Sequence, residues 1–176
     1  MGIKWTLFPE SPSGYISDKV FPEIACSVIS CFESHYAEIS SWNHSLNASD
    51  VLERLKGELT GIGFSVRQGK AKAERIYLPV LGGEAQEVLC EFSVDAYHKD
   101  SLLFLDVEAG RGVTNNEYLK TLLVASMLAD VRYLCIALRQ VYKSSRDYEK
   151  AGEFLRILYS SGAVDLALDG VLLIGY

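Results

Sequence analysis

Residues 131–138, VRYLCIAL, form the segment that most constrains the fold, because polar and apolar positions do not alternate along it. A strand that reads as a continuous apolar run is buried on both faces, which places it at the centre of a parallel or mixed sheet. The segment 114–127 before it repeats apolar residues at helical spacing. With a strand at 102–108, this order predicts a right-handed crossover. We therefore expect an α/β protein with a mixed β-sheet flanked by helices.

The remaining elements are predicted from periodicity and from capping signals. Asp50 with Glu53, and Thr114 with Glu117, match the capping box that opens a helix. Residues 1–16 contain prolines and a glycine and are expected to form an irregular arm. We expect helices at about 17–40, 49–62, 114–127 and 146–160, and strands at about 64–68, 76–81, 87–97, 102–108, 131–138 and 171–174.

A length of 176 residues fits one domain. We expect residues 1–176 to form it, with a core at about 50–138, an N-terminal helical extension at about 17–40 and a C-terminal helix and strand at about 146–176. No apolar run is long enough for a transmembrane helix, and the N-terminus lacks the apolar stretch of a signal peptide. The four cysteines form no CxxC pair, which is typical of free thiols in the cytoplasm.

The segment 101-SLLFLDVEAGRG-112 ends an apolar strand with two acids, Asp106 and Glu108. Because side chains alternate along a strand, both acids lie on one face. If the preceding strand brings its own polar face into register, Asp95 joins them at one end of the sheet. Three close carboxylates repel one another unless protons or a cation neutralise them. Such oxygen ligands suit Mg²⁺ or Mn²⁺; the alternative is a solvated acidic strand end in which Arg111 pairs with one acid.

The pattern of Asp95, ten residues, and Asp106-Val107-Glu108, together with the order of elements, resembles the PD-(D/E)XK, or restriction endonuclease-like, nuclease superfamily. The resemblance covers about half of the chain, residues 50–138. It implies a restriction endonuclease-like core and a metal-dependent endonuclease that hydrolyses DNA as a homodimer, with Mg²⁺ or Mn²⁺ as cofactor. Asp95 and Asp106 then stand where the superfamily has its metal-binding acids. The first core helix of the superfamily often adds an acid, for which Glu58 is the candidate.

Glu108 stands where the superfamily carries its lysine, and some type II restriction enzymes likewise have Glu or Gln there. In this register Glu108 binds a second metal ion or orients the attacking water. We expect this first register, because it keeps the Asp106–Glu108 pair on one strand face. In a second register Glu108 is the second acid and Gly110 replaces the lysine. That register leaves Lys99, Arg111 or Lys120 as a substitute for the lysine, or implies lost activity.

Contacts to DNA phosphates are expected from basic side chains. The formal net charge of −6 argues against binding of nucleic acid through overall charge, so such contacts must be local. The candidates are Arg67, Lys70, Lys72 and Arg111.

Two other functions stay open on the sequence alone. The missing lysine and the acidic composition are also typical of a catalytically inactive PD-(D/E)XK-fold protein that binds nucleic acid or serves in protein assembly. The third option is an interaction protein whose acids only keep a sheet edge soluble. Metal binding and metal-dependent cleavage distinguish the three.

Overall fold

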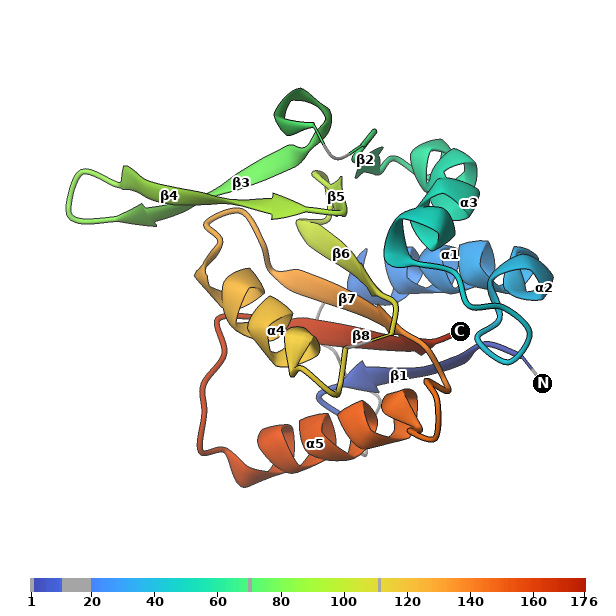
Figure 1. Cartoon of the computed structure of the whole chain (residues 1–176). Helices are drawn as coiled ribbons and strands as arrows, with labels where there is room; N and C mark the ends of the chain where they lie inside the picture. The colour runs from blue at the N-terminus through green and yellow to red at the C-terminus, as the bar shows by residue number, and fades with distance from the viewer. Residues whose placement is uncertain (1, 11–19, 70, 111) are drawn as a thin grey trace.

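A six-stranded mixed sheet forms the centre of the protein (Figure 1). The computed structural model describes residues 2–10, 20–69, 71–110 and 112–176. The three middle strands run parallel, and the strands at both edges run antiparallel to their neighbours. In order across the sheet the strands are β1 (Lys4–Phe8), β8 (Gly170–Gly175), β7 (Tyr133–Leu138), β6 (Leu103–Glu108), β5 (Ala96–His98) and β2 (Ser65–Val66).

Helices cover both faces of this sheet and bury two separate cores (Figure 1). On one face lie α1 (Val20–Ser34), α2 (Tyr36–Ile39) and α3 (Ala48–Gly61), and on the other lie α4 (Glu117–Met127) and α5 (Asp147–Ser161). All six residues of β7 are buried, as expected for a strand with no polar face. The α/β prediction is confirmed, and the helix that joins β6 to β7 is α4.

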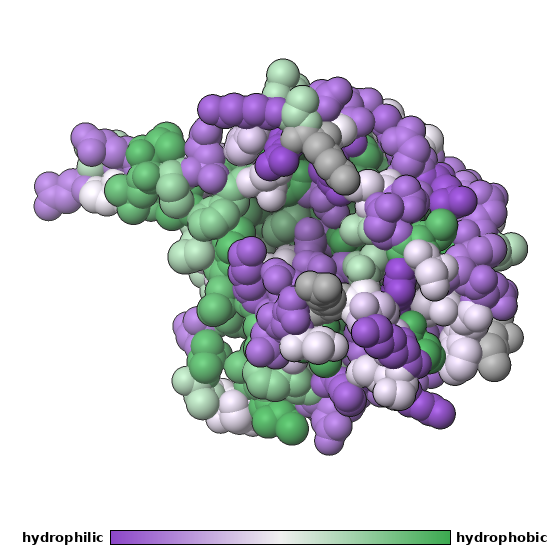
Figure 2. All heavy atoms as spheres, viewed as in Figure 1, coloured by the Kyte–Doolittle hydropathy of each residue, from purple (hydrophilic) through white to green (hydrophobic). Residues whose placement is uncertain are grey.

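A second, two-stranded sheet extends away from the body of the molecule (Figure 1). It consists of β3 (Ile76–Gly82) and β4 (Glu87–Val94). Its tip exposes Val88 and Leu89, and Figure 2 shows hydrophobic side chains on this projection. The single strand expected at 87–97 is therefore wrong, because the chain bends at Asp95 and passes from one sheet to the other.

The expected capping residues of two helices are also wrong. In α3 the cap is Asn47, whose side chain accepts a hydrogen bond from the Asp50 backbone N–H at 3.1 Å. Asp50 occupies the third helical position of the capping box, where its carboxylate accepts a hydrogen bond from the Asn47 backbone N–H. The cap of α4 is Asn116, in a left-handed conformation with φ of 56° and no side-chain cap. The turns that leave β6 extend to this residue, so Thr114 lies before the helix.

The N-terminal segment is more regular than the sequence suggests. Instead of an irregular arm, residues 4–8 form β1 and pair with β8, from Lys4 opposite Gly175 to Phe8 opposite Val171. Residues 11–16 of the expected arm lie outside the described residues. Within the described ranges, no helix combines the length and the apolar character needed to cross a bilayer.

Leu105 tests the central packing, because it pairs with Ala96 on one side and Cys135 on the other and is fully buried. We expect Leu105→Ala to lower the free energy of unfolding by about 2–5 kcal/mol through lost burial and a residual cavity. The matched control is Leu123→Ala on α4, whose side chain is 57% exposed and which we expect to cost less than about 1 kcal/mol. Urea titration measures both, and equal losses would contradict this description of the core.

Candidate active site

Asp106 and Glu108 project from the carboxyl end of β6 on the face that α4 covers. Because side chains alternate along a strand, both acids share a face with Phe104, which packs in the core beneath α4 and α5. Leu105 and Val107 pack in the core beneath α1 and α3. The hydroxyl of Thr121 on α4 donates to Asp106 Oδ2 at 2.9 Å. Both acids are only partly exposed. The prediction that the two acids share a face therefore agrees with the structure.

The surroundings of this pair disfavour charge. Burial, followed by the nearby charges of Asp95 and Glu108, raises the pKa of Asp106 well above its ordinary value. Burial also raises the pKa of Glu108, although a hydrogen bond with Asp106 opposes that shift. Two desolvated carboxyl groups in contact cannot both ionise without a compensating positive charge. The pair thus favours either a proton or a bound cation.

Asp95 reaches the same place by a different route from the one expected. Its Oδ2 accepts the backbone N–H of Val107 at 3.1 Å, and N–H groups of a strand point along the sheet rather than out of its face. Arg67 Nε donates to Asp95 Oδ1 at 2.5 Å, and Arg67 Nη2 donates to Ser49 at the start of α3. The carboxylate of Asp95 therefore lies at the sheet edge beside the pair. Burial raises its pKa despite the Arg67 guanidinium.

The fit of these acids to a metal ion follows from that geometry. Among the described residues, no group of three or more His, Cys, Asp or Glu side chains is arranged to hold a metal ion. Asp95 is committed to Arg67 and to the Val107 N–H, which leaves Asp106 and Glu108 as a pair. Mg²⁺ is commonly held by one or two carboxylates, with water and substrate phosphate completing its shell. The pair fits that mode and does not form a closed cage.

The structure does not bring Glu58 together with the three acids. Glu58 accepts a hydrogen bond at 2.7 Å from Ser34, the last residue of α1, and lies 3.7 Å from His35, which follows it. It follows Ser49, the α3 residue that contacts Arg67, by nine positions, or roughly 13 Å along a helix axis. The amino end of α3 faces the acids, and Glu58 lies near its carboxyl end.

The basic candidates have different locations. Arg67 is part of the site through its ion pair with Asp95. Lys72 is exposed on the short helix η1 (Lys72–Glu74) between β2 and β3. Lys70 and Arg111 lie outside the described residues. Lys99 is in the turn before β6, at the opposite end of that strand from Glu108 and roughly 16 Å away along it.

Of the two candidate substitutes among the described residues, Lys99 and Lys120, it is Lys120 that lies near the acids. It lines a pocket of about 200 Å³ together with Asp106, Glu108 and Thr121. Its charge acts to lower the pKa of Glu108, and its Nζ lies 3.6 Å from Glu117 Oε2. Thr121 was missed by sequence reasoning. The available signal was its place in the first turns of the helix that follows the acidic strand.

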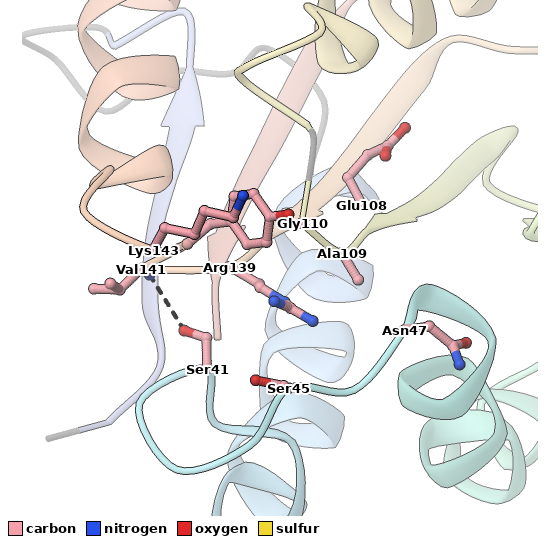
Figure 3. A pocket seen from close by; sticks show the side chains of 10 residues that line it. Ser41, Ser45, Asn47, Glu108, Ala109, Gly110, Arg139, Val141 and Lys143 are labelled. Carbon is pink, nitrogen blue, oxygen red and sulfur yellow. Dashed lines mark hydrogen bonds between the residues drawn. The ribbon is translucent and has the colours of Figure 1, made fainter.

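A larger cleft opens on the other side of Glu108 (Figure 3). Its volume is about 690 Å³, and Glu108 lines both this cleft and the smaller pocket. Three segments form its walls: 41–47, 108–110 and 139–143. Two of its residues are cations, Arg139 and Lys143, and sequence reasoning missed both. Arg139 directly follows the apolar strand β7, and Lys143 lies in the loop after it; this position at the carboxyl end of a central strand was the available signal.

Comparisons with known proteins support the fold. No model of a protein family matches the sequence, and no curated protein matches it significantly. A solved structure that the chain resembles is that of the restriction endonuclease BglII in complex with a DNA 16-mer. The TM-score is 0.51 at 13% identity, and the match covers 99% of this chain and 78% of that one. The protein therefore has a restriction endonuclease-like fold.

The raised pKa of Asp106 predicts a stability change with a defined sign. The unfolded chain releases the Asp106 proton near pH 3.8, whereas the folded protein retains it to higher pH, so this group lowers stability as pH rises between the two values. We expect Asp106→Asn to raise the free energy of unfolding at about pH 8 by roughly 0.5–2 kcal/mol, and by less near pH 4.

Urea titrations of the wild type and the variant across this pH range measure the difference. Asp100→Asn is the matched control, because Asp100 is exposed in the turn before β6. We expect this exposed substitution to change the free energy of unfolding by less than about 0.5 kcal/mol. A destabilised Asp106→Asn protein at pH 8 would contradict the description of a desolvated, repelled carboxyl group.

Proposed function

We propose that the protein is a metal-dependent endonuclease that hydrolyses DNA phosphodiester bonds. One observation carries the proposal: a desolvated carboxyl pair, Asp106 and Glu108, at the end of a central strand in a restriction endonuclease-like fold. Clustered groups with strongly shifted pKa values are typical of functional sites. The neighbouring fold in the comparison was solved with DNA, which motivates DNA as the substrate.

The residues of the site have separable tasks under this proposal. Asp106 and Glu108 would hold Mg²⁺ or Mn²⁺, with Asp95 as a third ligand when Arg67 releases it. When bound, the ion would neutralise a phosphate oxygen and lower the pKa of a water molecule. Thr121 orients Asp106 through its hydrogen bond. Lys120 brings a positive charge to the pocket wall, where it can stabilise charge that develops on the phosphate.

The assignment of Lys120 supports the second register of the superfamily motif, in which Glu108 is an acid and the lysine has moved. Lys120 comes from α4 rather than from β6, yet its side chain lines the same pocket as the acids. The kcat values of the Lys120 variants, predicted below, distinguish this register from the first one, in which Glu108 itself replaces the lysine.

We further propose a homodimer and a reducing, cytoplasmic setting. Cutting both strands of a duplex takes two active sites, and each chain carries one acid cluster. The cysteines at positions 26, 31, 90 and 135 are all free thiols, which is usual in a reducing compartment. Sedimentation of the protein with and without duplex DNA tests the dimer.

A catalytically inactive member of the same fold is the second candidate. The ion pair of Asp95 with Arg67 favours it, because the guanidinium occupies a carboxylate oxygen that a metal ion would need. Calorimetric titration with Mn²⁺ separates the candidates. Binding that is lost in Asp106→Asn supports an active site, whereas no heat of binding in the wild type supports the inactive protein.

Cleavage of duplex DNA tests the proposal directly. We expect the protein to cut plasmid DNA in Mg²⁺ or Mn²⁺ and not in EDTA. We expect the Asp106→Asn protein to be well folded, as the urea titrations test. It should lower the cleavage rate by at least about 10²-fold because it removes a metal ligand. Asp100→Asn should cut like the wild type. Equal rates for Asp106→Asn and the wild type would refute the site.

Lys120 has its own kinetic test. We expect Lys120→Ala to lower kcat by about 10–10³-fold, the range for loss of one charge-stabilising group, and Lys120→Arg to recover part of it. Lys4→Ala is the control, because Lys4 lies on the edge strand β1 and is paired with Glu149 at 2.7 Å. Wild-type kcat in Lys120→Ala would favour the register in which Glu108 occupies the lysine position.

A further inference from the structure

We propose that the cleft beyond Glu108 is a phosphate-binding subsite, in which Arg139 and Lys143 hold a backbone phosphate that flanks the scissile bond. This inference rests on the proposed function for its place in the reaction, but the binding that it describes is measurable without cleavage. The ligand chemistry is that of a phosphate group, and a DNA backbone is the source to which we assign it.

Arg139 is the residue that points to an anion. It follows the last residue of β7, is 8% exposed, and reaches into the space between the 41–47 loop and the 108–110 segment (Figure 3). Its Nη2 donates to the Leu46 carbonyl, and its guanidinium lies beside the Tyr176 hydroxyl. Within the described part of the chain, no carboxylate oxygen lies within 4 Å of its nitrogens.

A buried guanidinium without a carboxylate partner is costly unless an anion accompanies it. Arginine has five N–H donors, and two neutral oxygen acceptors leave donors for a ligand. Burial raises the pKa of the Asp147 carboxyl group and outweighs the charge of Arg139, which acts to lower that pKa. Since Asp147 forms no ion pair with Arg139, the guanidinium stays available to phosphate, which it can bind through two parallel hydrogen bonds.

Lys143 adds a second, exposed cation to the same cleft. It is exposed and occupies a left-handed turn with φ of 55°, closed by paired hydrogen bonds of 2.9 Å between Tyr142 and Ser145. Its Nζ lies 5.5 Å from the centroid of the Tyr142 ring, and the Arg139 guanidinium lies 5.4 Å from the same centroid. The ring therefore holds both cations at one wall of the cleft.

The walls are built to remain open beside these cations. Gly110 has φ of 109°, and a Cβ there would lie 3.1 Å from the Tyr142 ring, so glycine lets the loop pass close to the ring. On the opposite wall, Ser41 donates to the Tyr176 carbonyl at 2.5 Å and accepts from the Val141 N–H at 3.3 Å. These bonds anchor the 41–47 loop across the cleft (Figure 3).

The position of the cleft determines which phosphate it can take. Glu108 lines both the cleft and the acid pocket, and the Tyr176 hydroxyl donates to the Glu108 carbonyl at 3.1 Å. Two cations against one carboxylate give the cleft a local positive charge on a chain whose net charge is −6. Because Glu108 lines both spaces, a nucleic-acid strand whose scissile phosphate lies at Asp106 would extend a neighbouring phosphate toward Arg139 and Lys143.

The experiment measures binding of the whole protein to a fluorescent DNA duplex by anisotropy, with Ca²⁺ in place of Mg²⁺ and across a series of salt concentrations. We expect Lys143→Ala to weaken binding by about 3–10-fold and to reduce the slope of log K against log salt by about 1. Lys143→Arg should retain both affinity and slope. Lys4→Ala, which removes the same charge at the edge strand, should match the wild type.

Arg139→Lys keeps the charge but loses the planar fork, so we expect weaker binding with an unchanged salt slope; a thermal melt checks that this variant is folded. Wild-type affinity and slope in Lys143→Ala would overturn the proposal. Inorganic phosphate and a mononucleotide are titrated as competitors. Tight binding of either, with no difference between Lys143→Ala and wild type on the duplex, would assign the cleft to a free phosphate compound and also overturn it.

The two proposals fail separately. Duplex binding that depends on Lys143, without cleavage in Mg²⁺ or Mn²⁺, leaves the subsite in place and removes the nuclease activity. Cleavage that proceeds in a protein whose Lys143→Ala variant binds DNA normally removes only the subsite.

Discussion

The parallel pairing of β6 with β7 is the constraint on which the site depends. Its register places Glu108 opposite Leu138, so the residues that follow both strands emerge at the same sheet edge. The acids come from the end of β6 and the cationic cleft from the loop after β7. Crevices at the carboxyl ends of parallel strands are the usual ligand sites of α/β sheets. Both proposed subsites therefore follow from one ladder of backbone hydrogen bonds.

The charged groups at this sheet edge differ in whether a partner of opposite charge accompanies them. Burial raises the pKa of both Asp106 and Glu108, so this carboxyl pair favours a shared proton or a bound cation at the strand end. Asp95 is balanced by Arg67, and Arg139 lies nearby without a carboxylate partner among the described residues. Such a site lowers the free energy of unfolding, and binding of a ligand raises it again. A loss of stability at functional sites is common in proteins. An acidic chain can still contact DNA, provided that its cations gather where the phosphates lie.

The projecting β3–β4 hairpin has a different character from the cleft. Its turn and β4 carry Glu84, Glu87 and Glu91, and its tip exposes Val88 and Leu89. A β-ribbon can enter the major groove of DNA, but acidic side chains would oppose the phosphates there. Under the proposed function, DNA would therefore lie along the edge with Arg139 and Lys143 rather than along the hairpin.

The sequence by itself determined the features that depend on local periodicity. The apolar run at 131–138 identified the central strand, and alternation placed Asp106 and Glu108 on one face, because both follow from the pleat of a single strand. The tertiary structure decided the rest. The bend at Asp95, the separation of Glu58 and the approach of Lys120 and Arg139 depend on pairing and packing between segments far apart in the chain, for which one strand or helix carries no signal.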